Sequence, residues 1–348
     1  MKKKVAVALS GGMDSSFAAY LLKKGGWHVE GFTLLLCSGD ARCFNNESLA
    51  LAQKLCRKLN ITHHIVDARG LFQKKIIDYF VKDYLAGLTP NPCVFCNVLI
   101  KFGHLFEKIS SLGFKYLATG HYAGIGKEGR TLFLRKAKDS KKSQEYFLSL
   151  ISPSILKHLM FPLARYTKIK VKKGVCDNGI LFQERRESQD VCFVKAKPYS
   201  QFIKESVLSH LEYKGNIQHI NGEVLGMHKG IYNFTYGQRS GLGVSWKEPL
   251  YVTGIDSATK TVFVGEKKYL YKNEFIVSSM NWFLLPKGFR NIKVKIRYNA
   301  PRLNCAVKIE GKNAKVKLKS KAAAVTPGQI AAFYSGDMLL GAGIINKY

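Results

Sequence analysis

The chain has 348 residues, which predicts two or three domains because one hydrophobic core seldom serves so long a chain. Its hydrophobic content of 46% is ordinary for a globular protein, and no apolar run approaches the roughly 18 residues of a membrane span, which argues against a membrane protein. The 55 Lys and Arg against 24 Asp and Glu give a formal charge of +31; this predicts a polyanionic partner, unless the lysines are merely solvated.

The cysteines and the first residues both indicate a cytoplasmic protein. Eight irregularly spaced cysteines do not resemble the disulfide framework of a secreted domain. The apolar run Val5–Leu9 leads to Ser10-Gly11-Gly12 instead of a cleavage site, so we expect no signal peptide. Cys56, Cys176 and Cys305 have no polar constellation beside them, and we expect all three to fill the core.

The first 120 residues alternate short apolar strands with amphipathic helices. Strands are expected at 5–9, 28–36, 64–67 and 116–118, and helices at 14–24, 46–59, 70–84 and 96–111. This alternation predicts an α/β fold with a doubly wound parallel sheet. Ligands of such sheets bind at the carboxyl ends of the strands, where Ser10–Ser16, Leu34 and Gly120-His121 fall.

From about residue 210 the pattern changes to short strands separated by Gly, Asn and Asp turns. We therefore expect a catalytic domain over 1–207, a small Gly-rich module over 208–273 and a C-terminal β-barrel over 274–348. Two barrel segments carry charges at period two, which gives each strand one cationic face. RNA binding explains these faces, and protection of strand edges against pairing is the alternative. The charged residues are Lys293, Lys295 and Arg297 in one segment and Lys315, Lys317, Lys319 and Lys321 in the other.

A glycine loop follows the first strand and opens the first helix. Its backbone amides can approach an anion at the positive end of that helix, and it lacks the Lys of a Walker A loop. The loop resembles the PP-loop of the N-type ATP pyrophosphatases, which cleave ATP to AMP and pyrophosphate; an ordinary capped glycine turn is the alternative. The residues expected to bind ATP are Ala8, Leu9, Ser10, Gly11, Gly12, Met13, Asp14 and Ser15, with Leu34 and Gly120 beside the adenine unless Leu34 belongs only to the core.

Two cysteines lie in contexts that suit sulfur chemistry. Two prolines, Pro90 and Pro92, stiffen the approach to a helix that we expect to begin at Cys96, where the helix dipole favours a thiolate. Cys192 lies about a hundred residues downstream in a loop that changes from polar to apolar. Two such thiols can pass sulfur between them if the fold brings them together.

Six strings occur in the order seen in the tRNA-specific 2-thiouridylases, and the sequence resembles that family over nearly its whole length. They are the PP-loop, Thr89-Pro90-Asn91-Pro92-x-x-x-Cys96-Asn97, Ala118-Thr119-Gly120-His121-Tyr122, Lys142-x-Gln144 with Tyr146-Phe147-Leu148, Thr235-x-Gly237-Gln238-Arg239-x-Gly241-Leu242-Gly243, and Val325-Thr326-Pro327-Gly328-Gln329.

The resemblance implies ATP-dependent 2-thiolation of the wobble uridine of tRNA, with ATP and Mg²⁺ as cofactors. ATP would adenylate O2, Cys192 would carry a persulfide, Cys96 would act as nucleophile, and a Cys96–Cys192 disulfide would close the cycle. The uridine would leave its stack to reach this pocket. The implied tRNA contacts are Asn91, Pro92, Cys93, His121, Lys142, Ser143, Gln144, Arg297, Tyr298 and Gln329.

One departure concerns Cys93, which stands where many members of the family have Asp. A thiol with an ordinary pKa of roughly 8.5 is a poor substitute for a carboxylate. Three interpretations of Cys93-x-x-Cys96 stay open: persulfide chemistry, a [4Fe-4S] cluster held together with Cys192, and a structural zinc pair, for which two further ligands are missing. Cys37 and Cys43 lie outside the family pattern and are unexplained.

The implied partners are tRNA and a sulfur-relay protein or cysteine desulfurase that donates persulfide, with no membrane and a monomer as the expected assembly. Two other hypotheses compete. Another PP-loop enzyme, such as an argininosuccinate or GMP synthetase, would explain neither the cysteines nor the basic barrel. A non-catalytic RNA-binding module with a redox-sensing cluster would not need an intact phosphate loop. ATP consumption that depends on tRNA separates the three hypotheses.

Overall fold

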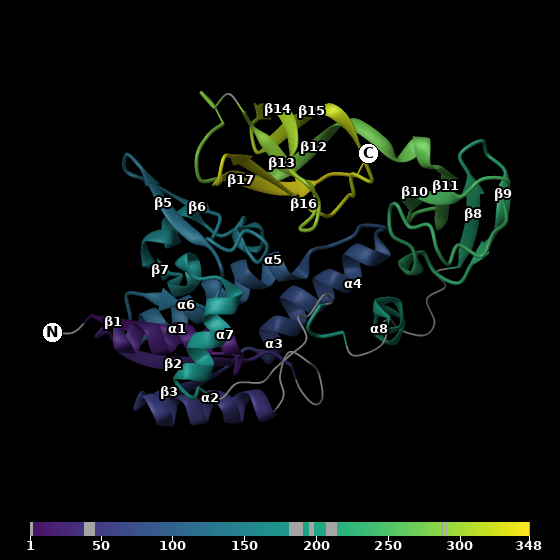
Figure 1. Ribbon diagram of the computed structural model, residues 1–348. Coiled ribbons are helices and arrows are strands. Elements are labelled where there is room, and N and C mark those ends of the chain that lie inside the picture. The colour runs from purple at the N-terminus through teal and green to yellow at the C-terminus, as the bar shows by residue number, and fades with distance from the viewer. Residues whose placement is uncertain are drawn as a thin grey trace.

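The computed structural model describes residues 3–37, 46–180, 191–194, 198–206, 214–286, 288–289 and 291–347, and Figure 1 shows the course of the chain. Its strands form three sheets of five, four and eight strands. In the described part of the chain, no helix has the length and hydrophobicity that crossing a membrane requires. Cys43 lies outside the described residues.

The five-stranded sheet is parallel throughout, with strand order β3-β2-β1-β4-β7. Period-two alternation in β1 gives the sheet two buried faces: Val5 and Val7 pack with α1, α2 and α7, whereas Ala6 packs on the side of α6. The predicted doubly wound parallel sheet is therefore confirmed. Its strands are β1 (Lys4–Ala8), β2 (His28–Leu35), β3 (His63–Asp67), β4 (Leu117–Ala118) and β7 (Leu159–Met160), and the helices are α1 (Met13–Lys24), α2 (Asn46–Leu59) and α7 (Lys168–Asp177).

Two further helical segments each contain a π-helical stretch. The first comprises α3 (Arg69–Phe72), η1 (Gln73–Ile77) and α4 (Asp78–Leu85), and the second comprises α5 (Pro92–Cys96), η2 (Asn97–His104) and α6 (Leu105–Ser111). The second segment begins at Pro92, so the predicted start at Cys96 was wrong. The Asn91 side chain accepts a hydrogen bond from the Val94 amide at 3.4 Å, and proline is pre-organised for the first helical turn.

The four-stranded sheet has the order β10-β11-β8-β9 and packs Ile217, Val252, Val262 and Val264 into a core of its own. Its strands are β8 (Gly215–His219), β9 (Val224–His228), β10 (Leu250–Asp256) and β11 (Thr261–Glu266), and α8 (Tyr199–Ser206) precedes them. Short helical turns elsewhere are η3 (Glu145–Leu148), η4 (Pro153–His158), η5 (Pro162–Arg165), η6 (Ile231–Asn233) and η7 (Lys267–Leu270).

The predicted C-terminal barrel is confirmed. Its strands pair in the order β12-β15-β14-β13-β16-β17, and β17 pairs back with β12, which closes a six-stranded barrel. In β15, Ala314, Val316 and Leu318 are buried while the lysines between them are exposed. The strands are β12 (Tyr271–Trp282), β13 (Lys293–Lys295), β14 (Leu303–Glu310), β15 (Asn313–Ala323), β16 (Ile330–Ser335) and β17 (Met338–Ile345).

A hairpin from the N-terminal half joins the barrel sheet. It consists of β5 (Gly124–Glu128) and β6 (Thr131–Arg135), and β6 meets β17 through the pair Arg135 and Met338. Figure 1 shows the hairpin beside the yellow β17. The catalytic half and the barrel therefore share one sheet of eight strands, an arrangement that the sequence patterns did not predict.

The core-filling prediction holds for two of three cysteines. Cys56 is buried between α2 and the parallel sheet, and Cys305 is buried inside the barrel. Cys176 is exposed, so the prediction was wrong there. In α7 the buried positions are Val171 and Val175, one helical turn apart, and Cys176 follows them onto the solvent face.

Candidate functional site

The phosphate loop leaves the N-terminus of α1 open to an anion. Gly12 precedes the helix and has no side chain with which to cap it. The Ser15 hydroxyl donates to the Gly12 carbonyl at 3.1 Å and accepts from the Ser10 amide at 3.2 Å, which closes the loop on itself. Gly11 has a φ of +71°, and a Cβ there would lie 2.2 Å from the Ser48 carbonyl oxygen, so only glycine fits. The loop can therefore present backbone amides at the positive end of a helix.

Asp14 connects the phosphate loop to two distant segments. Its carboxylate accepts hydrogen bonds from the Lys168 ammonium at 2.6 and 2.7 Å and from the Tyr122 hydroxyl at 2.8 Å. Lys168 is the first residue of α7, and its ammonium also lies 5.8 Å from the centre of the Tyr122 ring. Sequence reasoning missed Lys168, because nothing in a lysine-rich helix distinguishes one lysine from its neighbours.

Gly120 packs directly against this loop. A Cβ at Gly120 would lie 2.6 Å from the Ser15 nitrogen and 2.7 Å from the Asp14 carbonyl carbon. Leu34 is half-buried near the end of β2, which neighbours β1 in the sheet. Both residues thus lie at the sheet edge where the phosphate loop begins, as expected for groups beside a nucleotide. Their contact with adenine stays a prediction.

The two sulfur-carrying candidates lie against one apolar cluster. Cys96 is buried in it, and Cys192 packs against it from the chain between α7 and α8. Cys93, one helical turn before Cys96, has an exposed side chain. Cys37 belongs to the same cluster and is disulfide-bonded. The fold therefore brings together thiols that are about a hundred residues apart in sequence.

The environment of these thiols opposes their ionisation. Burial raises the pKa of Cys192 to about 12, and the thiols of Cys96 and Cys93 raise it further. Burial likewise raises the pKa of Cys96, and nearby protein atoms raise the pKa of Cys93 by desolvation although its side chain is exposed. Cys96 is the last of the five residues of α5 and lies near the start of the longer helical segment, but its burial opposes the expected thiolate, which stays a prediction.

Lys101 is the cation that opposes these shifts. It lies on η2, and its charge lowers the pKa of all three thiols and that of His121. Burial holds the pKa of His121 well below its ordinary value, so its imidazole is neutral, and Nδ1 lies 2.8 Å from the Thr119 hydroxyl. Sequence reasoning also missed Lys101, whose only signal is a lone charge in the apolar run from Val98 to Phe102.

The segment before Cys93 contacts both the barrel and the central module. The barrel residue Gln329 donates its side-chain amide to the carbonyl oxygens of Thr89 at 2.9 Å and Pro90 at 3.3 Å, and the Thr89 amide donates to Pro327 at 2.9 Å. On the side of the central sheet, a Cβ at Gly87 would lie 2.8 Å from a methyl group of Ile255. The barrel and the central module therefore both contact the approach to the cysteines.

Comparison with known proteins agrees with this geometry. Family models match residues 3–196 (tRNA methyl transferase HUP domain), 200–266 (tRNA methyl transferase PRC-barrel domain) and 272–345 (aminomethyltransferase beta-barrel domain). The tRNA-specific 2-thiouridylase MnmA 1 of Caldanaerobacter subterraneus subsp. tengcongensis is 40% identical over 360 residues, covering 100% of this chain and 99% of that protein. The chain belongs to the tRNA-specific 2-thiouridylase family. It is thereby an enzyme of the sulfurtransferase class.

Two further similarities differ in weight. The MnmA 2-thiouridylase of Aquifex aeolicus is 38% identical over 355 residues, with 99% of each chain covered. The U34-tRNA thiolase NcsA from Methanococcus maripaludis, solved with its [4Fe-4S] cluster, is 20% identical, covers 55% of this chain and 63% of its own, and has a TM-score of 0.35. A likeness this partial decides neither the fold nor the chemistry.

The cysteines that the structure describes do not form a preassembled site for a single metal ion. Among the residues that the structure describes, no group of three or more Cys, His, Asp or Glu side chains converges so that it could hold a metal ion. Cys93, Cys96 and Cys192 share a neighbourhood, but they do not converge on one metal ion, and an iron–sulfur cluster or a zinc pair there stays a hypothesis. We therefore derive no step through either group.

Several residues expected to contact tRNA in this 2-thiouridylase form bonds within the protein. The Gln144 side-chain oxygen accepts from the Tyr122 amide at 2.9 Å, and Ser143 is buried with its hydroxyl donating to Glu145. Arg297 donates to the Tyr236 carbonyl at 3.2 Å and to the Thr326 hydroxyl. Among these bonds, the one from Arg297 to Tyr236 joins the barrel to the central module.

Other expected tRNA contacts lie at module boundaries. The Tyr298 ring lies 4.4 Å from that of Phe147, centre to centre, and the Lys295 ammonium lies 4.9 Å from the centre of the Tyr298 ring. Lys142 is half-exposed. Asn91 caps the helix that carries the cysteines, and Pro92 is buried in its first turn. Contact of these residues with tRNA stays a prediction.

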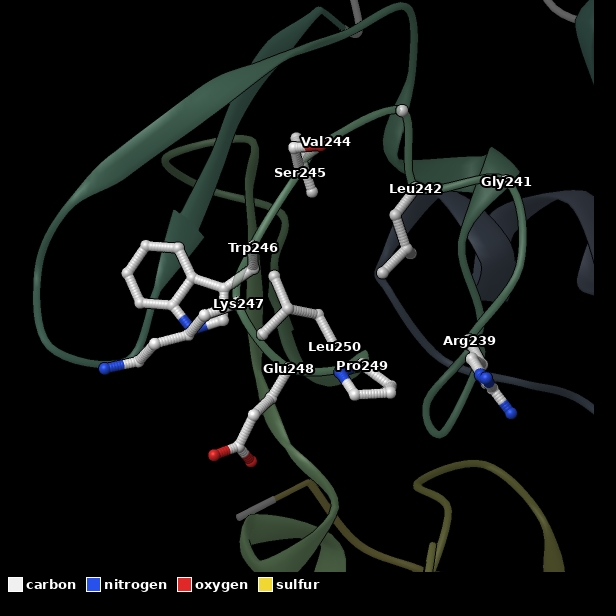
Figure 2. Close-up of a pocket in the computed structure, with 11 residues that line it drawn as sticks. Arg239, Gly241, Leu242, Val244, Ser245, Trp246, Lys247, Glu248, Pro249 and Leu250 are labelled. Carbon is white, nitrogen blue, oxygen red and sulfur yellow. The ribbon is translucent and has the colours of Figure 1, made fainter.

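The glycine-rich motif of the central module lines an open cavity of about 470 Å³. Gly241 and Gly243 have φ angles of +74° and +71°, a left-handed conformation that explains the two glycines. Figure 2 shows the Arg239 side chain on one side of this loop and Trp246 on the other. The Trp246 indole stacks on His219 with ring centres 4.5 Å apart, which fixes the loop against its sheet.

Proposed function

We propose that this enzyme replaces the 2-oxygen of the wobble uridine of tRNA with sulfur, after ATP has activated that oxygen. The observation that carries the proposal is the packing of Cys96 and Cys192 against one buried cluster, beside a segment that contacts both the barrel and the central module. Membership in the 2-thiouridylase family, and the tRNA uridine that its named members modify, support the same reaction. The formal charge of +31 suits a polyanionic substrate.

In the first step, ATP binds at the phosphate loop and the uridine O2 attacks its α-phosphorus, releasing pyrophosphate. The amides before α1 bind the phosphates, and Lys168 offers a positive charge beside Asp14. Mg²⁺ would neutralise part of the triphosphate charge, and Asp14 is the carboxylate of the loop that could hold it. The oxygen of C2 then leaves as part of AMP, which is a far better leaving group than oxide.

In the second step, the terminal sulfur of a Cys192 persulfide attacks C2, and AMP departs. The Cys96 thiolate then attacks the Cys192 sulfur, so that the new S–S bond joins Cys96 and Cys192 and the terminal sulfur stays on the uridine. Alternatively, Cys96 attacks first and releases hydrosulfide, which adds to C2. Either route leaves a disulfide that an external dithiol must reduce, and a persulfide-donating protein reloads Cys192.

The raised thiol pKa values fit a site that is unreactive until it is loaded. Burial keeps Cys96 and Cys192 protonated at neutral pH in the free enzyme. A protonated thiol is a weak nucleophile, so the unloaded protein is protected from oxidation. Lys101 is the nearby cation that would stabilise Cys96 as a thiolate when a proton leaves.

The test is thiolation of a tRNA transcript with ATP, Mg²⁺, a persulfide donor and a dithiol. Cys192→Ser and Cys96→Ser should abolish 2-thiouridine, measured by mass spectrometry of nucleosides. Cys176→Ser is the matched control, because its thiol is exposed on α7 and should be dispensable. Release of AMP that depends on tRNA distinguishes this reaction from the adenylation of a small molecule. Full thiolation by Cys192→Ser would contradict the proposal.

Iron analysis after anaerobic purification tests the cluster hypothesis separately. On the persulfide route, the enzyme should be active without bound iron or sulfide, and Cys93→Ser should retain much of the activity. Activity that requires iron and disappears in Cys93→Ser would replace this route with a cluster mechanism.

A further inference from the structure

A second cavity lies between the N-terminal half and the barrel, and its lining does not include the phosphate loop. Its volume is about 450 Å³, and four separate segments line it. They are the hairpin β5–β6, the chain that follows β6, the end of η5, and the turn between β16 and β17. Figure 1 shows β5 and β6 adjoining β17 at this junction.

The lining of this cavity is strongly cationic. Arg135, Lys136, Lys138 and Arg165 contribute positive charges, and Asp337 is the single carboxylate among the lining residues. About one residue in six of the chain is Lys or Arg, which would place one or two in a nine-residue lining by chance. In the part of the chain that the structure describes, none of the four forms an ion pair. Like charges held this close repel one another unless an anion joins them.

Backbone contacts build the cavity as a fixed feature. The Lys136 amide donates to the Asp337 carbonyl at 3.0 Å, and the Lys138 amide donates to the Ala164 carbonyl at 2.8 Å. Gly124 leaves room for Arg135 across the hairpin, because a Cβ there would lie 2.8 Å from the Arg135 Cγ. The segments that carry the cations are therefore hydrogen-bonded to one another in the protein without a ligand.

Arg302 fixes the turn between β16 and β17. Arg302 donates to the Gly336 carbonyl at 2.6 Å, and its guanidinium lies 3.5 Å from the centre of the Tyr334 ring. The same Arg302 lies 3.5 Å from the buried carboxylate of Glu145. The position of Asp337 in the lining is thus set by the contact between barrel and catalytic domain.

One hydrogen bond connects this cavity to the catalytic site. Asp139, in the segment that lines the cavity, accepts from the Lys168 amide at 2.9 Å, and the Lys168 side chain binds Asp14 of the phosphate loop. The same segment continues to Lys142. The segment beside the cavity therefore contacts the residue that pairs with the phosphate loop.

We propose that this pocket binds a backbone phosphate of the tRNA, and so fixes the register of the RNA across the junction between catalytic domain and barrel. The inference rests on the proposed function, because it assigns part of the same substrate to a second site. The alternative source of a phosphate is ATP, but its triphosphate is already assigned to the open N-terminus of α1. Arg and Lys side chains in a concave lining suit a phosphodiester. They bind its oxygens and make no contact that depends on the identity of the base.

The experiment measures tRNA affinity against salt concentration for Arg135→Gln, Lys138→Gln, Arg165→Gln and the triple variant. Each lost phosphate contact should reduce the slope of log K against log salt by about one. The three side chains are exposed, so the melting temperature should not change. Lys54→Gln, on an exposed position of α2, which lies at the lower edge of the molecule in Figure 1 and does not line the cavity, should leave the slope unchanged. Asp337→Asn should tighten binding, because it removes the one negative charge.

Two outcomes would overturn the inference. One is a triple variant with the affinity and salt slope of the wild type. The other is a triple variant that binds tRNA normally but loses affinity for a non-hydrolysable ATP analogue, which would assign the pocket to the nucleotide. Failure of the proposed function is seen separately: wild-type protein that binds tRNA with an ordinary salt slope but never thiolates it contradicts the reaction and leaves this pocket standing.

Discussion

Substitution of Gly120 by alanine tests whether the phosphate loop must keep its position. The added methyl carbon would lie 2.6 Å from the Ser15 nitrogen, whereas ordinary contact begins at 3.4 Å. The loop or the segment that carries Gly120 must therefore move by about 0.8 Å, and neither yields easily because both contacts are to backbone atoms. A displacement of about 1 Å at a reacting group costs on the order of a hundredfold in rate. We expect Gly120→Ala to lower tRNA-dependent AMP formation by about that factor.

The assay is release of AMP from labelled ATP at saturating tRNA, with the free energy of unfolding measured in parallel. Overpacking should cost about 1–3 kcal/mol, which leaves the protein folded. Gly70→Ala is the matched control, since a Cβ at Gly70 meets nothing within 4 Å. AMP formation by folded Gly120→Ala within twofold of the wild type would refute the argument that this close approach positions the loop.

Three further predictions concern other parts of the site and the core. Lys168→Met should weaken binding of an ATP analogue by about tenfold, a loss of roughly 1.4 kcal/mol, because Asp14 would then face the phosphates unpaired; equilibrium dialysis measures it. Burial raises the pKa of Cys305 from 9.0 to about 12, so the folded protein keeps a proton that the unfolded protein releases. The free energy of unfolding should therefore fall as the pH rises through this window, and urea unfolding at pH 8, 9 and 10 measures it. Glu145→Gln leaves Arg302 without its buried carboxylate and should cost about 3 kcal/mol in the same unfolding assay.

Local patterns were enough to predict two of the three sheets. The phosphate loop was placed correctly because a buried strand, two glycines and a helix follow one another directly in sequence. The barrel was predictable because β15 alternates strictly, with Val316 and Leu318 inside and Lys315 and Lys317 outside. In both cases neighbouring residues determine which face of an element is buried.

The features that sequence reasoning missed depend on contacts between distant segments. No local pattern pairs Arg135 of the hairpin with Met338 of the barrel, which are about two hundred residues apart. The same is true of Lys168, which matters because α7 begins beside Asp14. Cys176 was misplaced for a related reason: its apolar neighbours are buried, but helical spacing turns it outward.

The barrel lysines show that composition alone does not predict how much positive charge is available to bind phosphate. Lys315 and Lys317 lie 3.6 and 3.3 Å from the Glu274 carboxylate of β12, so part of the predicted stripe is neutralised within the barrel. Lys319 and Lys321 are exposed beyond that carboxylate. Salt bridges at such exposed positions contribute little to stability, and they reduce the charge available to phosphate.

The thiol environment also restricts the order of events on the proposed route. Burial raises the pKa values of Cys96 and Cys192, and phosphates of an incoming RNA would oppose ionisation further because they are negative. The phosphates of the substrate therefore do not favour the thiolate. A persulfide is more acidic than the thiol that carries it, so loading of Cys192 can supply an anionic sulfur where the bare thiol cannot. Sulfur must then be on Cys192 before C2 is attacked, and Lys101 is the cation that stabilises Cys96 as the thiolate that attacks Cys192.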